Sequence, residues 1–308
     1  MTLPAPDINT LTIIGCGLIG SSVARAARQS GAAAKIAVVD ADAANLEKAR
    51  SLAVADSYYA SADEGVAGAD LVIMAVPVGA MASVAESISS SLKAGAILSD
   101  VGSVKSSVLK SVRPVVPDSV HFIPGHPVAG TEQSGPEAGF ASLFDGRWCI
   151  LTPPEGADAG AVATLSAFWT KLGSKVDIMT ADHHDLVLAI TSHVPHLIAY
   201  NIVGTANDLE TVTRSEVIKY SAGGFRDFTR IAASDPTMWR DVFLNNKEAV
   251  LEMLGRFTED LTALQRAIRW GDGEALFDLF SHTRDIRKRI IDAGQDDDAP
   301  DFGRPHES

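Results

Sequence analysis

Cysteine is nearly absent from this chain of 308 residues. Only Cys16 and Cys149 occur, and Cys16 lies between two glycines at the end of an expected strand. Two cysteines are too few for a disulfide framework, which excludes a scaffold held together by disulfides. The same scarcity favours a reducing, cytoplasmic compartment.

Positive charge is the minority sign. Lys and Arg number 26 against 39 Asp and Glu, so the formal net charge is −13 and the pI is near 5.0. This balance excludes a general binder of nucleic acid or of anionic membranes, and we expect neither as a partner. Residues 294–308 carry five acids and one base, which predicts an acidic, disordered tail.

A targeting pattern is also lacking. The first ten residues contain no basic segment followed by an apolar run, so we expect no secretory signal. The longest stretch without a formal charge, residues 186–207, is long enough to span a bilayer, but it contains His193, Pro195 and His196. We therefore predict a buried domain helix there.

The first half of the chain alternates short apolar runs with alanine-rich, helix-like stretches. Its composition, 46% hydrophobic and 21% charged, is typical of one large or two modest globular domains. Apolar runs without alternation indicate strands covered on both faces, as in βαβ units of a parallel sheet. The expected strands are residues 11–15, 36–40, 71–76, 96–100, 121–125, 148–151 and 176–179.

The second half has a different pattern, mostly helical, from about residue 180. Apolar side chains recur there at helical spacing, and about half of that stripe would stay exposed on a small helical layer. A second copy of the chain would cover it, so we predict a homodimer. The expected domains are 1–179, 180–293 and the tail 294–308. The residues of the stripe are Val250, Leu251, Leu254, Phe257, Leu261, Leu264 and Ile268.

The motif GCGLIG follows the first expected strand and opens a helix. Gly15 makes the tight turn, Gly17 lets the backbone approach a pyrophosphate, and Gly20 lets helix and strand pack closely. The start of that helix, at Leu18 and Ile19, offers free N–H groups and a positive dipole end to phosphates. The first domain is therefore predicted to be a Rossmann-type dinucleotide-binding domain.

Asp40 stands twenty residues after Gly20, at the end of the next expected strand. A carboxylate there accepts hydrogen bonds from the adenosine ribose and repels a 2′-phosphate, which favours NAD over NADP without excluding NADP. A helix-capping role for Asp40 is the alternative. Val76 and Pro77 follow a later strand and are predicted to line the cofactor, although a plain turn explains them equally well.

Two polar clusters follow expected strands at the same sheet edge and should face the nicotinamide. In DVGSVK, Ser103 can orient a hydroxyl or an imidazole, and Lys105 is interpreted as a solvated lysine at a helix start rather than a ligand contact. In GHPVAGTE, His126 lies between Gly and Pro, where core packing is poor. Its ordinary pKa of about 6.5 suits removal of a hydroxyl proton while hydride leaves the same carbon.

Further polar residues lie in the helical half. His193 and His196, three residues apart, could form a hydrogen-bonded core pair, and no partner has the spacing to complete a metal site with them. The run Asp182 to Asp185 is interpreted as an exposed helix start. Arg226 and Arg230 form either a surface ion network or, turned inward, a bidentate site for a substrate carboxylate.

These motifs together resemble the prephenate/arogenate (cyclohexadienyl) dehydrogenase family. The resemblance covers residues 11–291, in the order GCGLIG, DVGSVK, GHPVAGTE, SHVPH, GFRDFTRIA and DPTMW, and GHPVAGTE is the most specific of them. It implies NAD-dependent oxidative decarboxylation of a cyclohexadienyl substrate in tyrosine biosynthesis. Whether that substrate is prephenate or arogenate stays open.

The resemblance also implies roles for individual residues. His126 would be the base on the ring hydroxyl, Ser103 would hold that hydroxyl and the histidine, and Arg230 would grip a substrate carboxylate with Arg226 as a second cation. Feedback by tyrosine, where it occurs, would act at the active site. The residues implied to line the substrate cavity are Thr131, Glu132, His193, His196 and Trp239.

Two other functions fit part of the pattern. Another dehydrogenase with a Rossmann domain and a helical domain, of the 3-hydroxyacid or imine type, would share the first motif but is expected to carry a catalytic lysine in its helical half. A noncatalytic NAD-sensing dimer would need only the glycines and Asp40. The set of Ser103, His126 and Arg230 argues against both.

Overall fold

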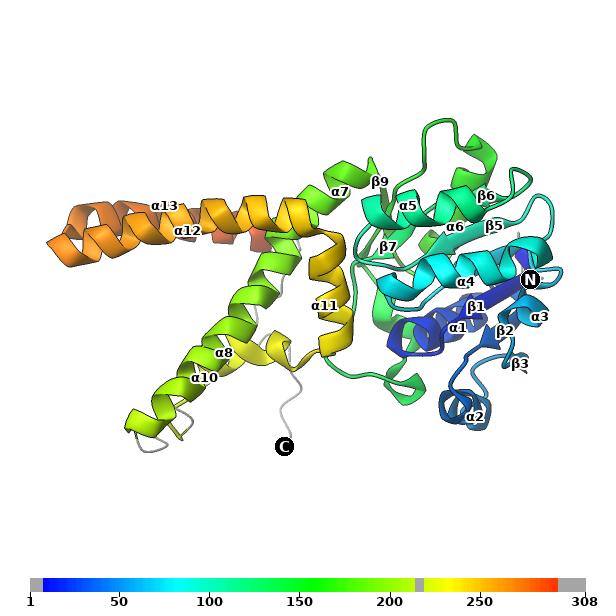
Figure 1. Cartoon of the computed structure of the whole chain (residues 1–308), viewed down its shortest axis with the longest axis horizontal. Coiled ribbons are helices and arrows are strands. Elements are labelled where there is room, and N and C mark those ends of the chain that lie inside the picture. The colour runs from blue at the N-terminus through cyan, green and yellow to red at the C-terminus, as the bar shows by residue number, and fades with distance from the viewer. Residues whose placement is uncertain (1–7, 214–218, 293–308) are drawn as a thin grey trace. The chain divides into compact units, whose positions relative to one another are not determined.

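The computed structural model describes residues 8–213 and 219–292, and a six-stranded parallel sheet lies at the centre of its first part (Figure 1). The strand order is β3-β2-β1-β4-β5-β6. The predicted tail, residues 294–308, lies outside the described residues. The strands are β1 (Ile8–Ile14), β2 (Ala33–Val39), β3 (Ser57–Tyr59), β4 (Leu71–Met74), β5 (Ile97–Asp100) and β6 (His121–Phe122).

Alternate residues of the central strands pack into two separate cores, as expected for a sheet covered on both faces. In β4, Leu71 and Ile73 face the core that helices α1, α2 and α6 share. Val72 and Met74 face the core formed with α3, α4 and α5. These helices are α1 (Leu18–Ser30), α2 (Ala43–Ser51), α3 (Ala62–Val66), α4 (Met81–Ile88), α5 (Ser106–Val112) and α6 (Ala159–Lys171).

The expected strand at residues 121–125 divides in two. β6 ends at Phe122, and β7 (Gly125–Pro127) begins a second, three-stranded sheet with β8 (Trp148–Leu151) and β9 (Lys175–Ile178). Pro124 lies between them and has no backbone N–H to continue the ladder. The chain therefore changes sheets immediately before His126, a change that the apolar pattern did not reveal.

The second half is helical, as predicted. Helices α7 to α11 pack in one unit with the sheets, a unit that ends at Leu251, and a second unit begins at Glu252. The predicted domain division near residue 180 stays a prediction. The elements are α7 (Ala181–Leu188), a π-helical turn η6 (Ala189–His193), α8 (Val194–Thr213), α10 (Gly223–Thr229), a 3-10 turn η7 (Arg230–Ala233), α11 (Pro236–Asn245), α12 (Lys247–Trp270) and α13 (Gly273–Asp292).

One helical stretch of the described chain, Ala181–Asp208, is long and apolar enough to cross a membrane by length and composition alone. Its first part carries the buried polar residues His184, Asp185 and His193. Asp185 accepts hydrogen bonds from the backbone of the loop after β5. Because these contacts join the stretch to the sheet, we interpret it as a domain helix, as the sequence predicted.

Candidate active site

The glycine turn between β1 and α1 is closely packed on one side and open on the other. Gly15 has φ +96°, and a Cβ there would lie 2.4 Å from the Ala75 carbonyl oxygen at the end of β4. A Cβ on Gly20 would lie 1.9 Å from the Gly15 oxygen, so only glycine fits either position. A Cβ on Gly17 would meet no described atom within 4 Å. Backbone N–H groups at this helix start therefore face space that suits a pyrophosphate.

Asp40 directly follows β2 at the same edge of the sheet. Its Oδ2 accepts a hydrogen bond from the Cys16 amide at 2.8 Å, and its Oδ1 accepts one from the Asp42 amide at 2.9 Å. Asp42 caps α2, so Asp40 is not the helix cap. These bonds hold the carboxylate beside the glycine turn, where a dinucleotide ribose would lie.

The other expected cofactor residues gather around this turn. Leu18 and Ile19 form the first turn of α1, and Val76 and Pro77 follow β4. The Val76 side chain lies 3.1 Å from the position of a Cβ on Gly15, so the two strand ends are adjacent. The residues present therefore fit NAD, although their contacts with it stay a prediction.

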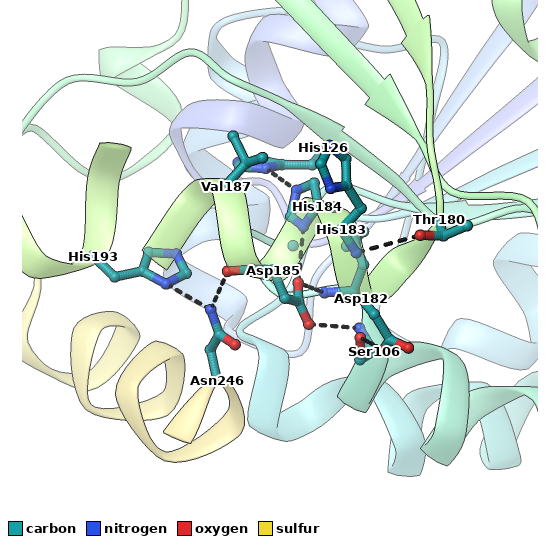
Figure 2. Close-up of polar contacts among 12 residues, drawn as sticks. Ser106, His126, Thr180, Asp182, His183, His184, Asp185, Val187, His193 and Asn246 are labelled. Atoms are coloured by element: carbon teal, nitrogen blue, oxygen red, sulfur yellow. Dashed lines mark hydrogen bonds and ion pairs between the residues drawn. The ribbon is translucent and has the colours of Figure 1, made fainter. Parts of the chain in front are cut away.

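His126, in β7, has a mostly buried imidazole that contacts a second imidazole. Its Nδ1 lies 2.8 Å from Nε2 of His184, and Nδ1 of His184 lies 2.8 Å from Oδ1 of Asp185 (Figure 2). Burial, followed by the charges of His184, Lys105 and His193, holds the pKa of His126 well below its usual 6.5. The imidazole is therefore neutral at neutral pH and able to accept a proton.

Lys105 is wholly buried, so its interpretation as a solvated lysine is wrong. Its Nζ pairs with the Asp100 carboxylate at the end of β5 and donates to the Gly125 carbonyl at 2.8 Å. Burial lowers the pKa of Lys105, and the Asp100 charge opposes that shift. The buried pair thus connects β5 to the residue before His126, which fixes the backbone that carries the predicted base.

Ser103 lies in the loop between β5 and α5, two residues before Lys105. The next residue, Val104, is fully buried against Trp239 and Val242 of α11. The catalytic loop expected from the sequence therefore packs directly on the helical half. The predicted contact of the Ser103 hydroxyl with a substrate stays a prediction.

Trp239 brings the two predicted histidines of the helical half together. The His196 ring stacks on Trp239 with centroids 3.6 Å apart, and the His193 ring meets it edge-on. His193 Nδ1 lies 3.0 Å from the Asn246 amide nitrogen. Burial lowers the pKa of His193 to about 4, which keeps its ring neutral. Among the residues that the structure describes, no group of three or more His, Cys, Asp or Glu side chains could hold a metal ion.

The two predicted arginines differ in their environments. Arg230, at the start of η7, pairs with Glu132 at 2.8 Å, across 98 residues of sequence. Arg226 pairs with its neighbour Asp227, and its side chain is 69% exposed. Burial lowers the pKa of His196, and the charge of Arg230 adds weakly to that shift. Thr131 lies next to Glu132 on the exposed loop after β7.

Three residues that surround His126 and His193 were not predicted from the sequence. They are His184, Asp185 and Asn246. The interpretation of residues 182–185 as an exposed helix start holds for Asp182 and His183 but is wrong for His184 and Asp185, which are buried. Position within α7 separates the pairs, because His184 and Asp185 lie on the buried helix face with Ala181 and Leu188, at the spacing of helical neighbours, whereas Asp182 and His183 lie on the exposed face. The available signal was the run of four ionisable residues directly before an uncharged helix.

The family models match most of the chain. The model described as the prephenate dehydrogenase nucleotide-binding domain matches residues 23–178, and that of the prephenate dehydrogenase dimerization domain matches residues 180–282. These matches do not favour a 3-hydroxyacid or imine dehydrogenase or a sensing dimer.

Curated relatives and a solved structure agree with these matches. A cyclohexadienyl dehydrogenase of Zymomonas mobilis is 42% identical over 90% of this chain and 94% of its own length. A prephenate dehydrogenase of Bacillus subtilis is 33% identical over 91% of this chain and 75% of its own. The crystal structure of prephenate dehydrogenase from Aquifex aeolicus, in complex with hydroxyphenyl propionate and NAD+, is 33% identical with a TM-score of 0.85, over 92% of this chain and 98% of that one.

Proposed function

Because this chain belongs to the prephenate dehydrogenase family, we propose that it catalyses the oxidative decarboxylation of prephenate, arogenate or both, with His126 as the base. The observation that carries the assignment of the base is the buried imidazole of His126, which directly follows Gly125, the residue whose carbonyl accepts a hydrogen bond from Lys105 of the loop after β5. General bases of this kind contribute about 10²- to 10⁴-fold to a rate.

In the proposed reaction His126 holds and moves the proton of the ring 4-hydroxyl. It takes that proton while the C4–H bond breaks and the C4–O bond gains carbonyl character. NAD+, when bound, accepts the hydride from C4. The bond between the ring and its carboxylate then breaks, CO2 leaves, its electron pair completes the aromatic ring, and the oxygen regains the proton from His126. Loss of CO2 and gain of aromaticity make the step effectively irreversible.

The proposed substrate contacts come from the helical half and the loop after β7. Arg230 binds a substrate carboxylate through two parallel N–H groups, exchanging its partner Glu132 for the ligand or sharing it. We propose that His193, His196, Trp239 and Thr131 line the same cavity, where the His196 ring stacks on Trp239, and that Arg226 is a second, more exposed cation. The Ser103 hydroxyl orients the substrate hydroxyl toward His126.

The decisive experiment follows the reduction of NAD by absorbance in the purified full-length protein, with prephenate and arogenate supplied in parallel. Turnover of either substrate supports the proposal, and the ratio of the two kcat/KM values decides which one is preferred. Binding of NAD without turnover of either substrate would contradict it.

The same assay decides the cofactor preference. Two backbone N–H groups hold the Asp40 carboxylate beside the glycine turn, where we propose that the ribose binds, so we expect NAD to give a higher kcat/KM than NADP. The matched variants are Asp40→Asn and, as a control for the loss of one exposed negative charge, Glu47→Gln on α2. A higher efficiency with NADP in the unaltered protein would show that Asp40 does not discriminate.

Three further proposals accompany this function. The match to a dimerization domain supports a homodimer. A cytoplasmic location is consistent with the buried, free cysteines. Tyrosine, which has the phenol ring of the product from prephenate and is itself the product from arogenate, would act as an inhibitor by occupying the active site itself.

A further inference from the structure

A chain of hydrogen bonds leads away from His126 on the side opposite its catalytic nitrogen. It runs from Nδ1 of His126 to Nε2 of His184, and from Nδ1 of His184 to Oδ1 of Asp185, each at 2.8 Å (Figure 2). Resting on the function proposed above, we infer that His184 and Asp185 are positioning residues that hold His126 as the Nδ1–H tautomer, with its Nε2 lone pair free to act as the base.

The direction of every proton in this chain follows from Asp185. Its Oδ1 accepts from the Lys105 amide at 2.7 Å and its Oδ2 from the Ser106 amide at 2.9 Å, so it acts as a carboxylate acceptor toward all its partners. Burial raises the pKa of Asp185, but the bonds from His184, Lys105 and Ser106 outweigh it and leave the pKa below the ordinary value. An ionised Asp185 can only accept a hydrogen bond, so Nδ1 of His184 carries the hydrogen and donates it.

The tautomer of His184 then determines that of His126. A neutral His184 that donates through Nδ1 has a lone pair on Nε2, so it must accept from its other partner. Burial lowers the pKa of His184, which favours this neutral form. The partner is Nδ1 of His126, which therefore carries the hydrogen. The remaining ring nitrogen of His126, Nε2, has the lone pair that proton removal requires.

The surroundings make this arrangement rigid. His184 is fully buried and Asp185 is 4% exposed. The backbone carbonyl of Asp185 accepts a further bond from the Asn246 amide at 2.9 Å. Helix α7 is thereby joined to α5 through Ser106 and to the end of α11 through Asn246, so the carboxylate cannot leave without breaking several buried bonds.

The arrangement also favours the proton-bearing form during catalysis. When His126 accepts the substrate proton on Nε2, its Nδ1–H still donates to His184, and the negative charge of Asp185 lies one imidazole away. A carboxylate that accepts a hydrogen bond directly from Nδ1 of a catalytic histidine is known to hold the productive tautomer and to stabilise the imidazolium. Here a second imidazole is placed between the carboxylate and the base.

The direct test is the tautomer itself. In full-length protein with ¹⁵N-labelled histidine and saturating NAD+, long-range ¹⁵N–¹H correlation spectra distinguish protonated from bare ring nitrogens. The His126→Asn variant identifies the signals of His126 by their loss. We expect a protonated Nδ1 and a bare Nε2 on His126. A protonated Nε2 would overturn the inference, whether or not the protein turns over prephenate or arogenate.

Kinetics of variants at His184 test the consequence. His184→Phe removes the acceptor, and we expect kcat to fall about 100-fold or more with little change in KM, because only proton removal is affected. His184→Gln restores an amide oxygen that can accept from His126 and an amide N–H that can donate to Asp185. We expect it to recover at least about tenfold of the lost kcat.

His183→Gln is the matched control, since His183 is the exposed neighbour on the same helix. Thermal unfolding shows whether each variant folds. If His184→Phe does not fold, the kcat of His184→Gln is the measurement that tests the inference. A folded His184→Phe with unchanged kcat would overturn the inference. So would equal losses in folded Phe and Gln variants, which would show that His184 merely fills space.

Discussion

At the scale of single residues, burial decides what each histidine can do. His126, His184 and His193 are buried, and desolvation, the largest cause in each case, lowers the pKa of all three. His183 belongs to the same run of ionisable residues as His184 but is exposed. A buried imidazole stays neutral at neutral pH and offers one donor and one acceptor in fixed directions. This is the state that proton removal and ligand orientation require.

The first residue-scale prediction concerns the base. His126→Asn should lower kcat by about 10²- to 10⁴-fold, because asparagine cannot accept a proton in the transition state. Its amide can still bond to His184, so the fold should persist. Steady-state NAD reduction and thermal unfolding measure the two effects, with His183→Asn as the exposed control. Turnover near that of the unaltered enzyme would remove His126 from the mechanism.

The second concerns the substrate carboxylate. Arg230→Ala should raise KM at least about tenfold while changing kcat less, because a bidentate charged contact is lost in ground and transition states alike. Arg240→Ala is a matched control: that arginine is also exposed and also pairs with an acid, Asp241. An unchanged KM would support a purely surface ion pair between Arg230 and Glu132.

At the scale of elements, the π-helical turn η6 connects α7 to α8 and ends at His193. Such turns add one residue to the helical repeat and are frequent at functional sites. Here the turn separates two groups of side chains. His184 and Asp185 precede it and face the sheet domain, whereas His193 is its last residue, His196 follows it, and both of these rings meet Trp239 of α11. The helix thus contributes residues both to the surroundings of the predicted base and to the predicted substrate cavity.

Because η6 ends at the buried His193, we expect the free energy of unfolding to depend on pH. The pKa of His193 is about 4 in the fold against an ordinary 6.5, so the unfolded chain binds the additional proton between these values. The free energy of unfolding is therefore highest above pH 6.5 and falls as pH decreases toward 4, by up to about 1.4 kcal/mol per pH unit for each such histidine.

Urea unfolding at pH 7, 6 and 5 measures this slope. His193→Gln should reduce it, because one titrating group is removed while an amide can still bond to Asn246. His183→Gln provides the comparison at an exposed position. An unfolding free energy that does not change across this range would show that the buried histidines protonate without cost.

At the scale of the whole molecule, large apolar side chains remain exposed in the second unit. α12 and α13 leave Ile268, Trp270, Phe277 and Phe280 between 57% and 73% exposed. Three of the seven residues in the predicted stripe, Leu251, Leu261 and Ile268, are likewise exposed. Patches of this kind mark protein interfaces. They agree with the match of residues 180–282 to a dimerization domain.

We therefore predict that the protein is a dimer and that a charge introduced on the exposed apolar surface of this unit weakens it. The unaltered protein should sediment as a dimer at micromolar concentration. Phe280→Glu should raise the dissociation constant at least about tenfold, because it places a charge in an apolar interface. Asp278→Ala is a nearby control at an exposed polar position. A monomer at micromolar concentration in the unaltered protein would refute the dimer.

Local patterns in the sequence were sufficient for the nucleotide turn and for the type of fold. The glycines of GCGLIG, the acid twenty residues later and the apolar strands act at fixed, short spacings, and the structure places them together at one sheet edge. The packing of Gly15 against the end of β4 and the bond from Cys16 to Asp40 follow directly from that turn. Backbone conformation at such spacings depends mainly on the residues themselves.

Only the tertiary structure decided the surroundings of the base. His126 and His184 are 58 residues apart, Asn246 reaches Asp185 across 61, and the burial of Lys105 depends on Asp100 and the Gly125 carbonyl. No spacing in the sequence relates such positions. The packing of separate elements determines which polar groups are buried and which groups they hydrogen-bond to. The sequence thus determined the fold class and the identity of the candidate base, and the packing of α7 and α11 on the sheets determined its neutral state and its hydrogen-bond partners.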